Sequence, residues 1–226
     1  MSETIRVDIW SDIACPWCYI GKHRFEAGVA EFRAAHPEVT IEVESHSYEL
    51  APDTPLDFAG SEIDFLVKHK GMPREQVEQM LGQMTELAAS EGIVFDFGRV
   101  KHANTRRAHR VLHLAKDRGV QPEVMQRLFR AYFEEGEDMS DPDALARLGA
   151  EVALDADEVR AALDSAKYGE AVDRDITRAQ MLGVTGVPFF LIEEKYGVSG
   201  AQSAEAFAGA FEQVLGLVRG EEPVQR

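Results

Sequence analysis

Cys15 and Cys18 are the only cysteines among the 226 residues of this chain, and they stand in the sequence Cys15-Pro16-Trp17-Cys18. Two thiols at this spacing on a helix lie about one turn apart. A thiolate is the nucleophile of disulfide exchange, and a second thiol nearby can attack the mixed disulfide that forms. Because no cysteine remains for a structural bridge, the pair predicts redox chemistry by a dithiol.

The residues around the cysteines predict a strand followed by a helix. Residues 5–10 alternate in a β-prone pattern, and a helical pattern runs on to about Ala35. The unpaired N–H groups of a first helical turn favour a negative charge, and Pro16 suits the first helical position because it needs no N–H partner there. We therefore expect Cys15 to be the exposed attacking thiol and Cys18, one turn further in, to be the resolving thiol.

Two other uses of such a pair are a zinc site and an inert buried pair. A structural zinc site requires four ligands, and the chain has no second C-x-x-C. The nearest imidazoles, His23 and His36, lie further along the same helical pattern. Pro16 and a helix start beside Cys15 argue against two inert cysteines. We expect no metal site here.

The composition narrows the class of partners. Forty acidic against 24 basic residues give a formal net charge of −16, which opposes binding to nucleic-acid backbones and to anionic membranes. No apolar run has the length of a signal peptide or of a membrane span. The expected location is the cytoplasm, where dithiols are kept reduced.

The hydrophobic pattern predicts an α/β protein with a helical interruption. Strands are expected at 5–10, 39–46, 187–193 and 196–199, with a tight hairpin at Glu194-Lys195, and a last helix at about 203–218. The chain between 61 and 183 is helical almost throughout, and 93–97 is expected to be a loop or an extended segment. This order is that of a thioredoxin fold, a central β-sheet flanked by helices, with a large inserted all-helical domain. We predict a discontinuous thioredoxin-like domain, 1–50 with 170–226, and a helical domain at 51–169.

Four segments resemble those of the FrnE-like branch of the DsbA family. The first is SDIACPWCYIGK at 11–22, and the second is GVTGVPFF at 183–190, which is similar to the loop that carries the cis-proline of thioredoxin-fold enzymes. Weaker matches are GAQS at 200–203, and Asn104-Thr105 with Ala108-His109-Arg110. Relatives of this branch include 2-hydroxychromene-2-carboxylate isomerases and kappa-class glutathione transferases. The resemblance implies a thioredoxin fold with a helical insertion and thiol–disulfide oxidoreductase activity.

The resemblance also implies roles for particular residues. Pro188 is expected to be a cis-proline beside the dithiol, and the backbone of Val187 would pair with an extended substrate. Pro16 and Trp17 would contact substrate. Asn104 would face the cleft besides capping its helix, and Gln202, at the start of the last helix, could help to hold a carboxylate of glutathione.

Three functions follow, of which disulfide exchange leads. The Cys15–Cys18 disulfide would be the redox group, with no bound cofactor. Its partners would be a disulfide-containing protein or a small thiol, and a reductant such as glutathione or a thioredoxin system. A glutathione-dependent isomerase or transferase is the second function, although a serine typically replaces the attacking cysteine in those enzymes. A redox- or metal-switched binding or chaperone module is the third.

Several polar residues have an ordinary explanation. His109 and His113 are spaced like metal ligands on a helix, but no third ligand is evident, so we expect surface or capping histidines. Asp12 is either a solvent-facing acid or, if it lies close to Cys15, a group that opposes the thiolate. Trp17 is either an exposed platform or a cover over the disulfide.

Overall fold

The computed structural model describes residues 3–220, and these contain one four-stranded sheet. The strands are β1 (Glu3–Ser11), β2 (Val39–Ser47), β3 (Phe189–Ile192) and β4 (Tyr196–Ser199), in the order β2-β1-β3-β4. β1 is parallel to β2 and antiparallel to β3, and β3 is antiparallel to β4. This mixed sheet confirms the predicted thioredoxin fold.

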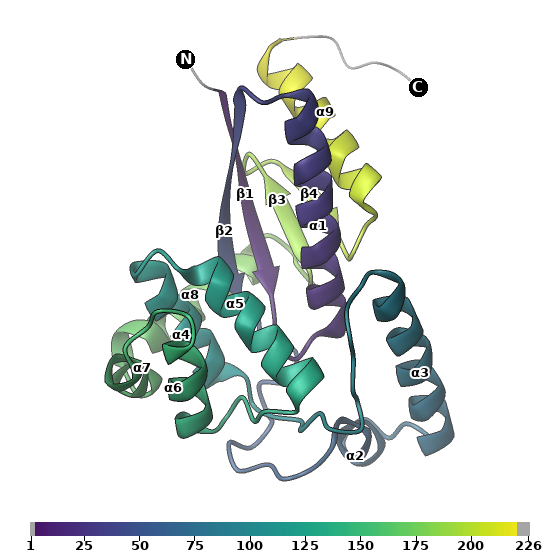
Figure 1. The fold of residues 1–226 in the computed structure, drawn as a ribbon, viewed down its shortest axis with the longest axis vertical. Helices are drawn as coiled ribbons and strands as arrows, with labels where there is room; N and C mark the ends of the chain where they lie inside the picture. Colours follow the sequence, from purple (N-terminus) through teal and green to yellow (C-terminus); the bar gives the residue numbers. More distant parts are fainter. Residues whose placement is uncertain (1–2, 221–226) are drawn as a thin grey trace.

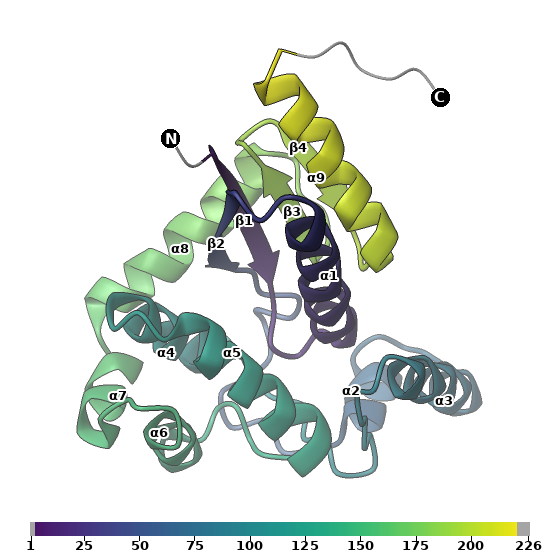
Figure 2. The same cartoon turned by 45° about the horizontal axis from the view of Figure 1, so that its top comes forward.

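Three helices cover the sheet, and the others form a separate layer below it. α1 (Pro16–Ala35) and α9 (Ala204–Val218) lie on one face, and α8 (Ala166–Met181) lies on the other (Figures 1 and 2). The remaining helices occupy the lower part of both views. They are α2 (Glu62–Lys68), α3 (Arg74–Ser90), α4 (Arg106–Asp117), α5 (Gln121–Arg130, continued as the π-helix η1, Ala131–Glu135), α6 (Pro142–Ala150) and α7 (Ala156–Leu163).

The predicted elements agree with these bounds except around β3. The strand expected at 187–193 is Phe189–Ile192 because Val187 and Pro188 belong to the preceding loop, which turns towards Cys15. Glu193 and Glu194 have positive φ angles and form the hairpin turn. Residues 93–97 are a loop whose alternate apolar side chains are buried. The domain boundary predicted after residue 169 falls inside α8, and it stays a prediction.

The core has two main parts, which meet at the start of α1. One lies between the sheet, α1 and α9, and contains the stacked or edge-on rings of Phe25, Phe190, Phe207 and Phe211. The larger part fills the helical layer, and it includes both cysteines. The first turn of α1 is therefore packed by the insertion as well as by the sheet. Within the described residues, no helix is both long and apolar enough to cross a membrane.

A glycine brings α1 and α9 together. A Cβ added at Gly28 would lie 2.7 Å from the Ala204 carbonyl oxygen and from the Phe207 Cβ, so no larger residue fits without moving backbone. This contact holds α1 close to α9.

We predict that Gly28→Ala destabilises the protein by about 1–3 kcal/mol, the usual effect of overpacking a core. Gly82→Ala is the control, because Gly82 lies on an exposed part of α3 with no atom near its Cβ position. It should stabilise by about 0.5–1 kcal/mol through helix propensity. Urea unfolding of both variants measures the difference. Equal shifts in the same direction would contradict the assigned contact.

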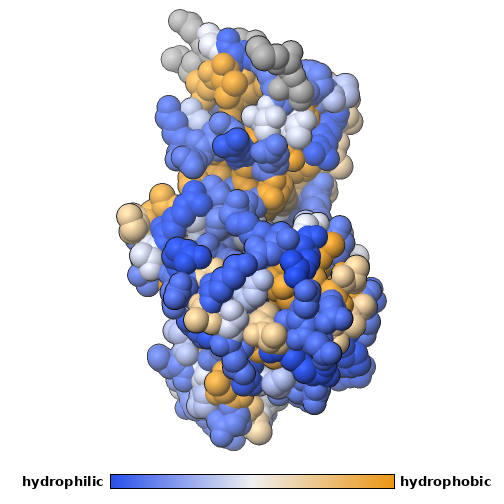
Figure 3. All heavy atoms as spheres, turned by 90° about the vertical axis from the view of Figure 1, so that its left-hand side faces the viewer, coloured by the Kyte–Doolittle hydropathy of each residue, from blue (hydrophilic) through white to orange (hydrophobic). Residues whose placement is uncertain are grey.

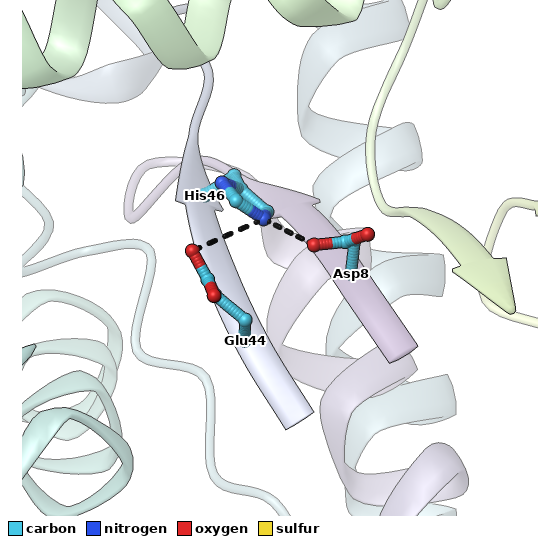
Figure 4. A group of neighbouring side chains, drawn as sticks. All are labelled: Asp8, Glu44 and His46. Carbon is cyan, nitrogen blue, oxygen red and sulfur yellow. Dashed lines mark hydrogen bonds and ion pairs between the residues drawn. The ribbon is translucent and has the colours of Figure 1, made fainter. Parts of the chain in front are cut away.

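A charged network joins α8 to the other face of the sheet. His46 Nε2 lies 2.6 Å from Asp8 Oδ1, and His46 Nδ1 lies 2.9 Å from Asp175 Oδ1. Arg178 donates to both oxygens of Asp8, at 3.2 and 2.9 Å. In Figure 4 the side chains of Asp8 and Glu44 point towards His46. The Glu44 Oε1 lies 3.7 Å from the His46 Nε2. β1, β2 and α8 are thus tied by groups of opposite charge.

The cluster of Asp8, Glu44 and His46 is compact enough to hold a metal ion, but each of these side chains already has a charged partner. Arg178 pairs with Asp8, Lys116 pairs with Glu44, and the carboxylates of Asp8 and Asp175 surround His46. Burial by itself lowers the pKa of His46, but its hydrogen bonds with Asp175 and Asp8 raise it to about 9. A protonated imidazole is not a ligand. The arrangement favours an ion-pair network over a metal site.

The raised pKa of His46 predicts a stability that depends on pH. Its contribution is fully present below the ordinary value of 6.5 and is lost as pH rises through about 9. The shift corresponds to a free energy on the order of 3 kcal/mol. We expect His46→Gln to be less stable than the wild type at pH 7, with the difference shrinking at pH 10. Urea unfolding at both values measures it, with exposed His23→Gln as the control. A difference that stays constant with pH would contradict the prediction.

Candidate active site

Cys15 caps the N-terminus of α1. Its backbone is extended, with φ −91° and ψ 112°, and Pro16 takes the first helical position. The Cys15 carbonyl accepts hydrogen bonds from the N–H groups of Cys18, at 3.0 Å, and Tyr19, at 3.4 Å. Cys18 therefore lies on the first turn, one turn from Cys15, and both are free thiols. The predicted start of the helix and the spacing of the dithiol are as the sequence indicated.

The prediction that Cys15 is exposed was wrong. Its exposed fraction is 3%, and that of Cys18 is 1%. The Cys15 sulfur points at the loop before β3 and lies 3.6 Å from the Val187 carbonyl oxygen. Both cysteines also pack in the core that extends into the helical layer. No local sequence pattern indicated that the insertion would close over the first turn of α1.

The surroundings of Cys18 separate the two thiols chemically. Burial, followed by the hydrogen bond and the charge of neighbouring Cys15, raises the pKa of the Cys18 thiol well above its ordinary value. Cys18 therefore stays protonated near neutral pH. The Cys15 sulfur lies at the N-terminus of α1 and beside the Val187 carbonyl, so the two thiols have different surroundings.

The loop before β3 lies directly on α1. The Val187–Pro188 peptide bond is cis. A Cβ added at Gly21 would lie 2.7 Å from the Pro188 Cγ, so this glycine lets the proline ring approach the helix. On its other side the Pro188 carbonyl accepts a hydrogen bond of 2.9 Å from the Gly200 N–H. The loop is thereby held between α1 and the segment that leads into α9.

A cavity of about 420 Å³ opens beside Pro16 and Trp17. Its far wall comes from α2 and α3, with apolar side chains such as Phe65, Met80 and Met84. Trp17 is 42% exposed, which agrees with a platform rather than a cover. Among the described lining residues, Lys70 carries the only fixed positive charge. This cavity, called the dithiol cavity below, is lined by Ala14, Pro16 and Trp17 beside the cysteines, and it suits an apolar group next to the dithiol.

A polar strip crosses this apolar cavity, and the sequence did not reveal it. Glu62 Oε2 lies 2.8 Å from His102 Nδ1 and accepts a hydrogen bond of 3.5 Å from the Tyr132 hydroxyl. Burial, then the charges of Glu62 and Asp12, raise the pKa of Tyr132 well above its ordinary value. Tyr132 is therefore a neutral hydrogen-bond donor. These residues come from separate helices and a loop, so no sequence spacing connects them.

Asp12 is buried beneath the turn that carries the cysteines. Its carboxylate accepts hydrogen bonds from the N–H groups of Leu50, at 2.8 Å, and Ala14, at 3.3 Å, and lies 3.3 Å from His109 Nε2. Burial alone would raise the pKa of Asp12, but its contacts with His109 and the Leu50 N–H lower it. Asp12 therefore remains charged, and it holds the turn in place.

The expectation of surface or capping histidines on α4 was wrong. His109 and His113 are both buried. His113 Nε2 lies 3.2 Å from the Ser47 hydroxyl and 3.2 Å from Asp175, while His109 pairs with Asp12. Their spacing on one face of α4 arises because this face packs against the thioredoxin part.

Two predicted contact residues lie away from the dithiol cavity. Asn104 does not line it: its side-chain amide donates to the Thr54 carbonyl at 2.8 Å, and its oxygen accepts from the Arg106 N–H at 3.0 Å. It anchors a loop and accepts the first N–H of α4, whose N-cap residue is Thr105. Gln202 is exposed before α9, and its amide donates to the Ser199 carbonyl. A substrate contact by either residue stays a prediction.

Comparison with known proteins agrees with this geometry. Residues 6–212 match the family described as DSBA-like thioredoxin domain. The structure of a probable DsbA oxidoreductase, SCO1869 from Streptomyces coelicolor, is similar at a TM-score of 0.86 and 39% identity, covering 98% of this chain and 93% of that one. The uncharacterized protein YwbO of Bacillus subtilis (strain 168) is 26% identical over 211 residues, 92% of this chain and 96% of that protein. The cytosolic disulfide reductase DsbM from Pseudomonas aeruginosa, solved with GSH, shares the fold at a TM-score of 0.64 and 18% identity, covering 93% of this chain and 98% of that one.

This likeness accounts together for three features: the dithiol at the start of α1, the loop of Val187 and Pro188 against it, and the sheet order. The match to this family covers most of the chain, and the similarity to the Streptomyces protein extends over nearly all of it. The chain belongs to the family of DsbA-like thioredoxin-domain proteins.

Proposed function

We propose that this chain is a thiol–disulfide oxidoreductase that exchanges disulfides with a protein or small-molecule substrate through Cys15 and Cys18. The observation that carries the proposal is the placement of two free thiols on one helical turn, with the Cys15 sulfur against the loop of Val187 and Pro188. Disulfide exchange needs a nucleophilic thiol and a second thiol within reach of the mixed disulfide, and this spacing provides both.

The reaction proceeds by two displacements. The Cys15 thiolate attacks one sulfur of a substrate disulfide, which forms a mixed disulfide and releases the other substrate sulfur as a thiolate. Cys18 then loses its proton and attacks the Cys15 sulfur, which oxidises the pair to a Cys15–Cys18 disulfide and releases the second substrate thiol. The reverse sequence introduces a disulfide into a substrate. The compartment's redox potential sets the direction, and we propose a cytoplasmic location with net reduction.

The substrate would lie between two surfaces already present. The Val187 backbone next to Cys15 can pair with an extended segment, and the cavity beside Pro16 and Trp17 can take an apolar side chain. Both thiols are buried, so substrate entry requires the loop or the helical layer to move slightly.

We predict that Cys15→Ser lowers insulin reduction by about 100-fold or more, because the nucleophile is lost. Cys18→Ser should also stop turnover, but it should accumulate a mixed disulfide through Cys15. Mass spectrometry of the non-reduced protein identifies the trapped sulfur. The double Cys→Ser variant controls for binding without exchange. A Cys18→Ser protein that forms no adduct at Cys15 would refute the role assignment. Chaperone activity retained in the double variant would favour a binding module.

Glutathione is proposed as the small-molecule partner of the same dithiol. The structural neighbour DsbM was solved with GSH. In this chain the polar start of α9 at Gln202 lies next to Gly200, whose N–H donates a hydrogen bond to the Pro188 carbonyl. The scarcity of cations around the dithiol cavity argues against a dedicated glutathione transferase site.

We expect reduced glutathione to reduce the Cys15–Cys18 disulfide, with little conjugation of an aromatic substrate. Equilibration in glutathione redox buffers followed by thiol alkylation measures the first, and absorbance of a chlorodinitrobenzene conjugate measures the second. Cys15→Ser should lose exchange with glutathione. Conjugation that survives in Cys15→Ser would instead support the isomerase or transferase alternative.

A further inference from the structure

A second cavity, of about 460 Å³, lies on the opposite side of the first turn of α1 from the dithiol cavity, and no residue lines both. Its floor is the face of β1 and β2 that points towards α1, and its sides are α1 and the N-terminal turn of α5. The walls are mainly apolar: Ile9, Phe25, Val29, Ile41, Val43 and Phe190. The redox chemistry proposed for the dithiol gives this cavity no role.

The cavity exists because α1 does not cover β2 completely. The close contact at Gly28 holds α1 against α9, and β2 is the edge strand on the other side of the sheet. Ile41 is therefore buried, whereas Val43 on the same face of β2 is 45% exposed. Figure 3 views the molecule from this side, and hydrophobic surface is visible at the waist between its upper and lower parts.

The charged side chains that line the cavity differ in whether they have an ion-pair partner. Lys22 pairs with Glu26 at 2.6 Å and also donates to Gln126, so both charges are compensated. Arg33 donates to the Ile41 carbonyl at 3.3 Å and forms no ion pair with any residue between 3 and 220. Among the described residues that line the cavity, Arg33 therefore carries the one charge without an ion pair, in a protein of strongly negative net charge.

We propose that this cavity binds a small amphipathic carboxylic acid, with its apolar chain between α1 and the sheet and its carboxylate on Arg33. A cavity of this volume, lined mainly by apolar groups with one placed charge, is typical of small-molecule sites. A guanidinium binds a carboxylate through two parallel hydrogen bonds. Cys18 and Pro188 also line the cavity, so the bound chain would reach the rear of the dithiol turn.

Isothermal titration with sodium decanoate tests the proposal. The wild type should bind decanoate, and Arg33→Gln should weaken binding by at least about tenfold because the charge-assisted hydrogen bonds are lost. Val43→Glu should weaken it similarly by placing a negative charge at the cavity. Arg6→Gln is the matched control: it removes the same charge from the opposite face of β1, and its affinity should equal that of the wild type.

A second ligand separates the charge from the apolar contacts. Decanol has the same chain without the carboxylate, and Arg33→Gln should leave its affinity unchanged. Lys70→Gln tests the dithiol cavity as the location of the ligand, and it should have no effect on decanoate. All variants change exposed or partly exposed side chains, and thermal melting confirms that each is folded.

Three results would overturn the proposal. They are the absence of decanoate binding to the wild type, equal affinities for the wild type and Arg33→Gln, and a loss of binding in Lys70→Gln but not in Arg33→Gln. None of these results bears on disulfide exchange, because the titration uses the reduced protein and measures no redox step. Cys15 and Cys18 variants would still decide that function separately.

Discussion

The packing of the first turn of α1 against the loop before β3 is the contact on which the rest of the site depends. It places the Cys15 sulfur by the Val187 carbonyl, and it is possible because Gly21 has no Cβ to meet the Pro188 ring. The same loop is held from behind by the Gly200 N–H. A dithiol on a helix terminus alone would be a reactive pair, and in the exchange proposed above the opposing loop adds a backbone edge for the substrate.

Burial sets the chemical state of Cys18 within the dithiol. Cys18 lies deeper, and its pKa is raised by burial and by Cys15. The helical insertion causes much of this burial, since its core continues into the turn. The insertion therefore contributes to the raised pKa of the Cys18 thiol.

Charged groups are buried on the side of the sheet that faces α8, and each is paired. His46 lies between Asp8 and Asp175, and Asp12 pairs with His109 across the boundary between the thioredoxin part and α4. Such pairs add little net stability compared with apolar packing, but removing one partner leaves an unpaired buried charge. They thus fix how the two parts of the molecule fit together, while the α1 side of the sheet is left with an apolar cavity.

The sequence by itself determined the elements and the candidate reactive residues of this protein. The dithiol, the strand before it and the helix after it were predicted because their signals are local: residue type, spacing and turn chemistry over a few positions. The loop at Pro188 was expected from the resemblance to thioredoxin-fold enzymes, since the local pattern placed residues 187–193 in a strand. The thioredoxin fold followed from the order of the elements. Only the tertiary structure decided the burial of Cys15, the pairing of His109 with Asp12, the anchoring role of Asn104 and the two cavities. These features arise where segments distant in the chain meet, and the exposure or pairing of a side chain there depends on neighbours that hydrophobic periodicity cannot identify.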